Sequence, residues 1–411
     1  MKTSLARPRI LSLTLLLLSA AVVQAIDNSM YVDPTIGNVA KLLVPTYPTY
    51  HLPNQMIRMI PISDNYIDDQ ITAFPLQVTE HRSWGIMQMR FSTGEITAGV
   101  WDRRMTRDQD LEVRHPWQYS TYLIDDDITV GFVPGRTCAI YKVEFPAGVR
   151  KNLLIRGVDR MQGAALDGSS FRLEETIRYI TRGVEPVTRV MTAYCYAQLT
   201  DVEGQPVSGV AFEPGPSRFA ISLNAEAPAA VLLKYAISYV SVDQARKNFA
   251  AEVGSRGFEE MTRQGKAAWD EALGKISVEG GTEAQKRTFY TALYRTYERM
   301  VNINEGGLYY SGYDARVHKS DRPFYVDDWV WDTYLADHPL RILINPAGEA
   351  DMLNSYTLMY EQSGWMPTFP EVHGNHQCMN CFHSSAIFLD AHRKGIGGYD
   401  IEKAYEGIRK N

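Results

Sequence analysis

The stretch from Gly364 to His383, GWMPTFPEVHGNHQCMNCFH, gathers side chains that could transfer protons, bind a metal or bond to each other. It contains one glutamate, three histidines and two cysteines, namely Glu371, His373, His376, His383, Cys378 and Cys381. A glutamate and histidines can supply a general acid, hydrogen bonds to a substrate or metal ligands. The alternative is a polar loop before a helix, with His383 hydrogen-bonded in a core.

The metal and redox motifs in this stretch are incomplete. His373 and His376 fall in a Gly-Asn loop, whereas the helical HExxH motif aligns two zinc ligands with a base. The Cys378-Met-Asn-Cys381 segment lacks the βαβ context of a thioredoxin motif and the second ligand pair of a zinc site. We therefore expect two ordinary cysteines, which could be bonded to each other.

A second stretch, FYVDDWVWDTYLADHPL (324–340), combines carboxylates with aromatic rings. Carboxylates accept hydrogen bonds from the hydroxyl pairs of sugars, and aromatic faces cover the apolar face of a sugar ring. A core helix with its rings inside and its aspartates solvated at the ends explains the same pattern. The residues concerned are Asp327, Asp328, Asp332, Asp337, Trp329, Trp331 and Tyr334.

A third stretch, NEGGLYYSGYDARVH (304–318), reads as a hairpin rich in tyrosine. Tyr309, Tyr310 and Tyr313 could lie over a pocket, or they could pack against a neighbouring sheet. We assign these tyrosines no catalytic role.

The composition restricts the class of protein. The chain has 411 residues, 45% hydrophobic and 22% charged, with a formal net charge of −6. This length allows two domains, and the charge argues against binding to nucleic acid. Residues 1–25 resemble a signal peptide with cleavage after Ala25. No later segment is long enough to span a membrane, so we expect a soluble secreted or periplasmic protein.

The hydrophobic pattern changes twice along the chain and predicts three regions. Residues 26–242 alternate with period two, as in AVLLKYAISYV (230–240), which predicts an antiparallel β-sandwich. Residues 243–281 have helical spacing, with Asp243 as the expected cap, and end in a strand-like ISVEGG (276–281). From Thr282, helical patterns recur near residues 328–336, 347–361 and 378–394. They suggest the first part of a helical barrel in an incomplete chain.

Taken in order, these stretches resemble glycoside hydrolase family 92, the calcium-dependent inverting exo-α-mannosidases. The resemblance rests on YVDPTIGN (31–38), AAWDEALGKISVEGGTEAQKRTFYTALYRT (267–296), WDTYLADHPL (331–340), GWMP (364–367) and LDAHRKGIGGYDIEKAY (389–405). It implies a β-sandwich packed against an (α/α)6 barrel, with the active site between them. It also implies calcium, although the ligands and the catalytic base are expected beyond Asn411.

The resemblance also assigns roles to residues. Asp332 should bind hydroxyls of a terminal mannose, and Trp331 should belong to the pocket wall. The family's general-acid position falls on Asn375, an amide that cannot donate a proton as a carboxylic acid does. Glu371 or His376 would then substitute for the acid. Two further departures are Leu335 in place of an arginine and Cys381 in place of a glycine.

Three hypotheses follow. The first is the N-terminal portion of an exported α-mannosidase that acts on mannose-containing glycans, inactive as this fragment. The second is a carbohydrate-binding relative that has lost hydrolysis, which Asn375 and Leu335 favour. The third is a purely structural surface protein. Linkage preference and oligomeric state have no signal in the sequence.

Overall fold

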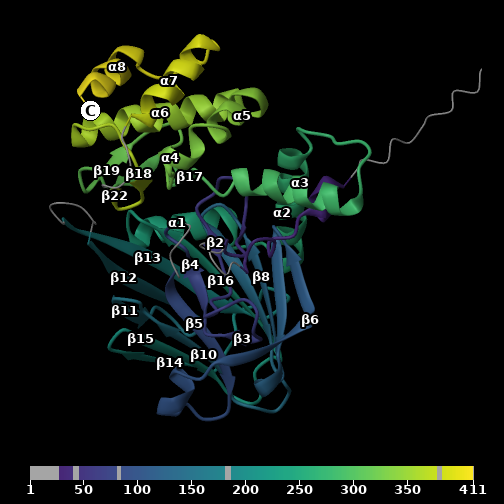
Figure 1. Cartoon of the computed structure of the whole chain (residues 1–411). Helices are drawn as coiled ribbons and strands as arrows, with labels where there is room; N and C mark the ends of the chain where they lie inside the picture. The colour runs from purple at the N-terminus through teal and green to yellow at the C-terminus, as the bar shows by residue number, and fades with distance from the viewer. Residues whose placement is uncertain (1–26, 40–45, 81–84, 181–186, 377–381, 411) are drawn as a thin grey trace, which may run out of the picture.

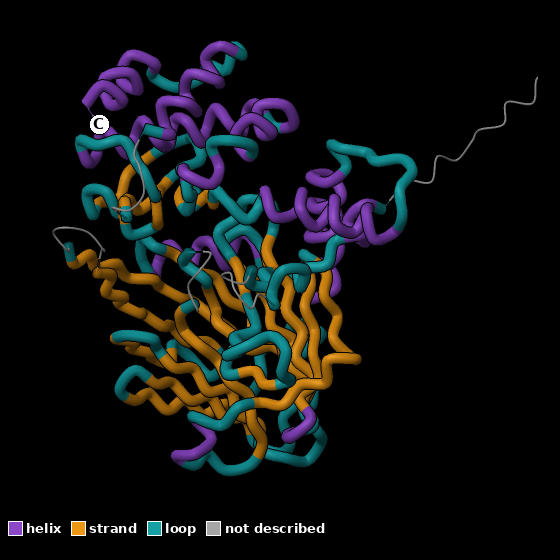
Figure 2. Tube along the Cα trace, viewed as in Figure 1, coloured by secondary structure: helices purple, strands orange, loops and turns teal. Residues whose placement is uncertain are grey.

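The computed structural model describes residues 27–39, 46–80, 85–180, 187–376 and 382–410. Strands occupy the first part of the chain and helices most of the last part (Figure 2). In Figure 1 the helices α4 to α8 lie together above one end of the strands, and α2 and α3 form a separate group beside them. The predicted signal peptide and both cysteines of the CxxC segment lie outside the described residues.

Two antiparallel sheets form the N-terminal sandwich. The larger has nine strands in the order β11 (Arg160–Ala165), β12 (Ser170–Ile180), β13 (Thr188–Thr200), β16 (Ala230–Ser238), β9 (Cys138–Glu144), β8 (Ile128–Pro134), β7 (Gln118–Leu123), β6 (Met105–His115) and β3 (Gln70–Ile71). The smaller has five strands in the order β14 (Val210–Gly215), β15 (Arg218–Leu223), β10 (Lys151–Arg156), β5 (Ile86–Thr93) and β4 (Phe74–Gln77). A two-stranded pair, β1 (Tyr50–His51) and β2 (Arg58–Met59), accompanies them.

Strand β16 shows how the alternating sequence builds the core. Val231, Leu233, Tyr235 and Ile237 are buried in the main hydrophobic cluster, as period two predicts. The opposite face is buried too, because Leu232 packs in a second cluster with side chains of two helices, α1 (Val242–Glu252) and α2 (Phe258–Leu273). Helical cover on the outer face therefore explains why both faces of this strand are shielded from water.

The remaining helices and strands follow in chain order. They are α3 (Glu283–Thr296), β17 (Val301–Asn302), β18 (Leu308–Ser311), β19 (Arg316–Lys319), β20 (Tyr325–Val326), α4 (Val330–Thr333), α5 (Asp337–Ile344), α6 (Pro346–Ser363), β21 (Pro370–Glu371), β22 (Gly374–Asn375), α7 (His383–Arg393) and α8 (Ile401–Lys410). Short 3-10 helices lie at Asn28–Tyr31, Ala98–Trp101 and Ile124–Asp126. Among the described residues, no helix combines the length and apolar character that a membrane crossing requires.

Helix boundaries confirm some local predictions and correct others. Thr282 caps α3 in a capping box with Gln285. Helix α1 is capped by Ser241, whose hydroxyl accepts from the Gln244 amide, so the prediction of Asp243 as the cap was wrong. Ser241 has extended backbone angles, as a cap requires, whereas Asp243 already lies in the first turn. Residues 276–281, all described, form no strand.

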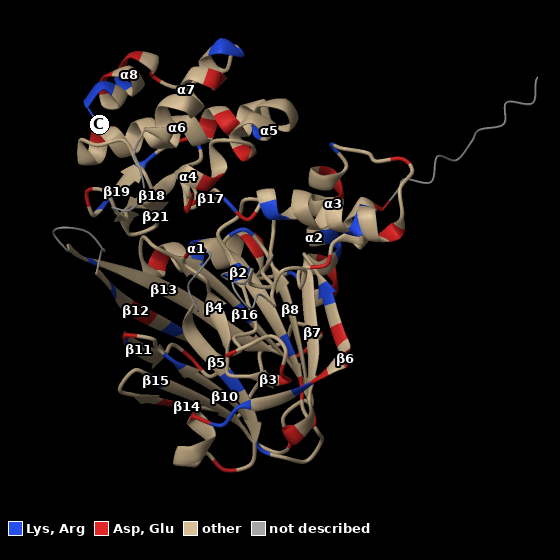
Figure 3. Cartoon of the chain, viewed as in Figure 1, with Lys and Arg blue, Asp and Glu red and all other residues tan. Residues whose placement is uncertain are grey.

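The helix expected near residues 328–336 is only α4, four residues long. Asp328 is not helical because its backbone amide donates to the Pro370 carbonyl at 2.9 Å. Helix α5 begins after a turn, at Asp337, and Pro339 occupies its first turn. Acidic and basic residues are interspersed over the strands and helices in the view of Figure 3.

Candidate active site

The short hairpin β21–β22 carries Glu371 and Asn375 on adjacent strands. Asn375 fastens this hairpin, because its Oδ1 accepts from the backbone amides of Thr368 and Phe369, both at 2.9 Å. Its Nδ2 donates to the Thr368 hydroxyl at 3.2 Å. The amide of Asn375, at the position where the resemblance predicts the acid, therefore holds the chain in place.

Two glycines let this hairpin approach the sandwich. Gly374 has φ +117°, and a Cβ there would lie 2.0 Å from Nη1 of Arg189 on β13. That nitrogen donates to the carbonyl of Gly312 at 2.7 Å, and a Cβ at Gly312 would in turn lie 2.1 Å from the His373 carbonyl carbon. The His373 ring stacks on Tyr179 of β12, with centroids 3.5 Å apart. The sandwich and the hairpin thus meet at van der Waals contact.

Glu371 lies in a buried cluster at this junction. Its Oε2 is 2.7 Å from Nε2 of His373 and 3.6 Å from Nδ1 of His376, and Glu80 Oε2 is 3.8 Å from the same His373 nitrogen. Burial and the adjacent charge of Glu80 raise the pKa of Glu371 well above its ordinary range. The two carboxylates outweigh burial and raise the pKa of His373 as well. The raised pKa favours the protonated form of Glu371 more than for an ordinary glutamate.

The same cluster has the composition of a possible metal site. Glu80, Glu371 and His373 each offer one ligand atom within 4.8 Å of the others. Calcium takes six to eight oxygen ligands, whereas these residues supply two carboxylates and one imidazole nitrogen. The cluster does not fit calcium, and the expected calcium ligands are not found in it.

A second buried network lies next to the hairpin and was missed by the sequence reasoning. Asp328 Oδ2 accepts from His338 Nε2 and from the Thr333 hydroxyl, both at 3.1 Å, and also from the Tyr356 hydroxyl. His338 Nδ1 lies 2.8 Å from Glu349 Oε1. All three charged residues are at most 1% exposed. The carboxylates of Glu349 and Asp328 overcome burial and raise the pKa of His338 to about 9.

The role of this network is to position the segment that leads to Asp332. The Asp328 amide donates to Pro370, so the network also connects α5 and α6 with hairpin β21–β22. The feature of the sequence that could have pointed to this network is the pair Asp337-His338 before a proline. Nothing in the sequence indicated that Glu349 would be the partner of His338.

The aspartates and rings of the second stretch do not form the core helix that was considered. Asp327 is fully buried and paired with Arg58 Nη1 at 2.5 Å, and Asp337 pairs with Arg341 at 2.6 Å. Asp332 is exposed on α4, and Trp331 is 47% exposed. A core helix would have its rings inside and its aspartates at the solvated ends. Here most of the carboxylates are inside and Trp331 is outside, which is the opposite arrangement.

Trp331 belongs to a group of rings around His383. The His383 ring centroid lies 4.8 Å from that of Trp331 and 4.2 Å from that of Tyr334. His383 is the first residue of α7, which brings the stretches 324–340 and 364–383 together at this point. Leu335, at the position of the family's arginine, is 73% exposed.

His376 lies beside Glu371, with its Nδ1 3.6 Å from Oε2 of that residue. Its side chain is 21% exposed, and its ring centroid lies 5.7 Å from that of Phe369. It is thus more accessible than Glu371, whose side chain is 7% exposed. The exposed residues Asp332 and Trp331 and the acid candidates Glu371 and His376 lie on segments in direct contact, through the rings of Trp331 and His383 and the hydrogen bond from Asp328 to Pro370.

The tyrosine hairpin packs in the core. Tyr309 stacks on Phe324 with centroids 4.0 Å apart, and its hydroxyl accepts from Gln362 at 2.9 Å. Tyr309 and Tyr313 are both buried in the main cluster. The packing interpretation of this hairpin is therefore confirmed for these two residues.

Comparisons with known proteins identify the family. The model of the glycosyl hydrolase family 92 N-terminal domain matches residues 31–210, and that of the family 92 catalytic domain matches residues 244–411. None of the curated proteins compared with the chain matches it.

Solved structures agree with this match. A family GH92 α-mannosidase from Bacteroides thetaiotaomicron is 22% identical with a TM-score of 0.81, over 93% of this chain and 56% of that protein. The structure of this α-mannosidase in complex with mannoimidazole is also 22% identical, with a TM-score of 0.79, over 93% of this chain and 55% of that protein. A family GH92 inverting mannosidase from B. thetaiotaomicron is 23% identical with a TM-score of 0.79, over 92% of this chain and 54% of that protein.

The chain therefore spans little more than half the length of these structures. At this level of identity they show the fold, and the expected β-sandwich followed by part of a helical barrel is confirmed. Together with the two domain matches, this fold establishes that the chain belongs to glycoside hydrolase family 92.

Proposed function

We propose that the protein is an exported glycoside hydrolase that releases terminal α-linked mannose from glycans with inversion, with Glu371 as the general acid. The family supports glycoside hydrolysis in general. The observation that supports this particular acid is the position of Glu371 in the junction between sandwich and helices, buried and beside Glu80. A general acid must be protonated before the glycosidic bond breaks, and a raised pKa provides that state.

In this mechanism Glu371 donates its proton to the glycosidic oxygen as the bond to the anomeric carbon breaks. His373, 2.7 Å away, is then placed to stabilise the carboxylate that forms. A second carboxylate must activate water from the opposite face, roughly 6.5–9.5 Å from the acid. We assign this role to none of the described residues. Asp332 and Trp331 would bind the terminal sugar, and calcium, implied by the family, would require ligands other than the Glu80 cluster.

The leaving group separates the two acid candidates experimentally. With the protein encoded by the complete reading frame, Glu371→Gln should slow hydrolysis of an unactivated mannobiose by about 10²- to 10⁴-fold. It should have little effect on dinitrophenyl mannoside, whose leaving group needs no proton. His376→Gln is the matched comparison, because its side chain lies only 3.6 Å from the same carboxylate.

Equal losses on both substrates would show that Glu371 is structural, and a leaving-group dependence confined to His376→Gln would transfer the acid role to that residue. Mannose released with retained configuration would contradict inversion.

One observation favours a second function, a carbohydrate-binding relative without hydrolysis. Both ends of the Asn375 amide are hydrogen-bonded inside the hairpin, so no acid stands at the family's position. This candidate requires mannoside binding that is lost in Asp332→Ala, together with no hydrolysis of either substrate, with or without calcium.

A further inference from the structure

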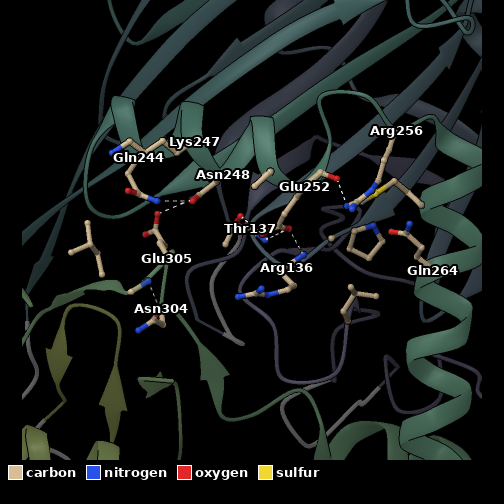
Figure 4. Close-up of a pocket in the computed structure, with 18 of the residues that line it drawn as sticks. Arg136, Thr137, Gln244, Lys247, Asn248, Glu252, Arg256, Gln264, Asn304 and Glu305 are labelled. Carbon is tan, nitrogen blue, oxygen red and sulfur yellow. Dashed lines mark hydrogen bonds between the residues drawn. The ribbon is translucent and has the colours of Figure 1, made fainter. Parts of the chain in front are cut away.

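The buried carboxylates of Glu80 and Glu371 lack the donors that other buried carboxylates have. In the pocket of about 870 Å³ beside helix α1, for example, Glu305 accepts from Asn248 Nδ2 at 2.8 Å (Figure 4). Among the described residues, no donor, His373 included, is in hydrogen-bond geometry with the buried atoms Glu80 Oε2 and Glu371 Oε2. Buried polar atoms are normally hydrogen-bonded, so these two oxygens call for another partner.

The side chains of this cluster come from two parts of the fold. Glu80 follows strand β4 of the sandwich, Glu371 belongs to β21, and His373 lies in the turn between β21 and β22. One ligand atom of each lies within 4.8 Å of the others. The His373 ring is held by its stacking on Tyr179, and the hairpin by the close packing at Gly374. The three groups are therefore positioned before anything binds.

The spacing and the chemistry of these groups fit zinc. Zinc binds imidazole nitrogen and carboxylate oxygen at about 2.0–2.2 Å, so two ligands of a tetrahedral ion lie roughly 3.4 Å apart. His373 Nε2 lies 2.7 Å from Glu371 Oε2 and 3.8 Å from Glu80 Oε2, on either side of that value. Shifts of about 1 Å complete the geometry. Two carboxylates balance the charge of the ion, and three protein ligands leave the fourth position to water.

The cluster has one side through which an ion can enter. The Glu80 side chain is 22% exposed, whereas those of His373 and Glu371 are 3% and 7% exposed. A zinc ion that arrives at Glu80 thus meets the two buried ligands behind it. The buried surroundings strengthen its attraction to both carboxylates.

We propose that Glu80, Glu371 and His373 form a reversible zinc site that joins the sandwich to the hairpin β21–β22. The protons that these groups hold are released as the ion binds. The metal site does not depend on the proposed hydrolysis. Its effect on activity rests on the proposed function: an ion on Glu371 occupies the oxygen that donates the proton, so zinc inhibits hydrolysis of unactivated mannosides.

Titration calorimetry with zinc, on the purified untagged protein in calcium-containing buffer, tests the site. One zinc ion should bind per chain. Even partners outside the ligand shell contribute about 10- to 100-fold to metal affinity, so Glu80→Gln and His373→Gln should each weaken binding by about 100-fold or more. His318→Gln is the matched control, because its imidazole also lies 2.9 Å from a carboxylate, that of Asp314, but belongs to no three-ligand cluster of the described residues. It should leave the affinity unchanged.

Cobalt(II) is a second probe of the same ligands. Its visible absorption distinguishes a four-coordinate protein site from the hydrated ion. The bands should appear with the parent chain and with His318→Gln, and they should be lost in Glu80→Gln and His373→Gln. Near-UV circular dichroism in zinc-free buffer should be the same for all variants, which excludes unfolding as the cause. If His373→Gln does not fold, Glu80→Gln carries the test, because its side chain is partly exposed.

Three results would overturn the site: no zinc binding at millimolar concentration, full affinity in Glu80→Gln and His373→Gln, or an equal loss in His318→Gln. Calcium that competes equally with zinc would overturn the assignment to zinc.

Activity separates this site from the proposed function. With the protein encoded by the complete reading frame, zinc should slow hydrolysis of mannobiose, and a chelator selective for zinc over calcium should restore it. Hydrolysis of dinitrophenyl mannoside should change little. Zinc that binds at these ligands without slowing mannobiose hydrolysis would refute Glu371 as the acid and leave the metal site standing. Hydrolysis that depends on Glu371 in a protein that binds no zinc would refute the metal site alone.

Discussion

Replacing His338 by glutamine removes the cation that holds Asp328 and Glu349 together inside the helical region. The imidazole contacts these carboxylates at 3.1 and 2.8 Å, and all three side chains are at most 1% exposed. Breaking a buried charge network leaves uncompensated charge behind and typically costs about 3–5 kcal/mol. We expect a loss of that size in the free energy of unfolding at pH 6.

The loss should depend on pH in a defined direction. Folding raises the pKa of His338 from 6.5 to about 9, so the charged form is stabilised in the folded protein. Its contribution is fully present below pH 6.5 and disappears as the pH rises through about 9. The difference between these pKa values corresponds to about 3 kcal/mol. The parent chain and His338→Gln should therefore differ by about 3 kcal/mol less at pH 9.5 than at pH 6.

Urea unfolding at several pH values measures this difference directly. His318→Gln is the matched control, because His318 Nε2 lies 2.9 Å from Asp314 but its side chain is 30% exposed. This surface pair should contribute less than about 1 kcal/mol. A His338→Gln destabilisation that stays constant from pH 6 to 9.5 would refute the assignment of the charge to His338. A value as small as that of His318→Gln would refute the buried network as a source of stability.

Two further predictions concern local geometry. Gly374→Ala should lower the free energy of unfolding by about 1–3 kcal/mol, because φ at Gly374 is +117° and the new Cβ would lie 2.0 Å from Arg189. Urea unfolding measures this loss. Gly168→Ala is the control, because no atom lies within 4 Å of the new Cβ, and its effect should be near zero. An equal effect of the two changes would contradict close docking of the hairpin. Thr282→Ala should cost about 1 kcal/mol by removing the cap of α3, measured in the same way. Thr288→Ala, within the same helix, should be neutral or stabilising, and a loss equal to that of Thr282→Ala would show that the cap is not the cause.

Much of the fold could be predicted because it depends on neighbours in the sequence. The alternation in β16 and the Thr282 capping box are local patterns whose physical consequence is the same in any chain. The resemblance to family 92 likewise rests on ordered motifs, and the domain matches confirm it. Asp243 was predicted wrongly as the cap of α1, because Ser241 has the extended backbone and accepts from the Gln244 amide. The strand predicted at residues 276–281 is not formed either.

The sequence by itself determined the β-then-helix order, the family and the candidates Asp332, Glu371, Asn375 and His376. Only the tertiary structure decided which groups surround these side chains. The proton of Glu371 depends on burial and on Glu80, which the sandwich brings to the hairpin from far away in the chain. Asn375 is occupied within its own hairpin, and His338 is charged because Glu349 lies beside it. A pKa depends on the charges and the solvent around a group, and folding alone sets both.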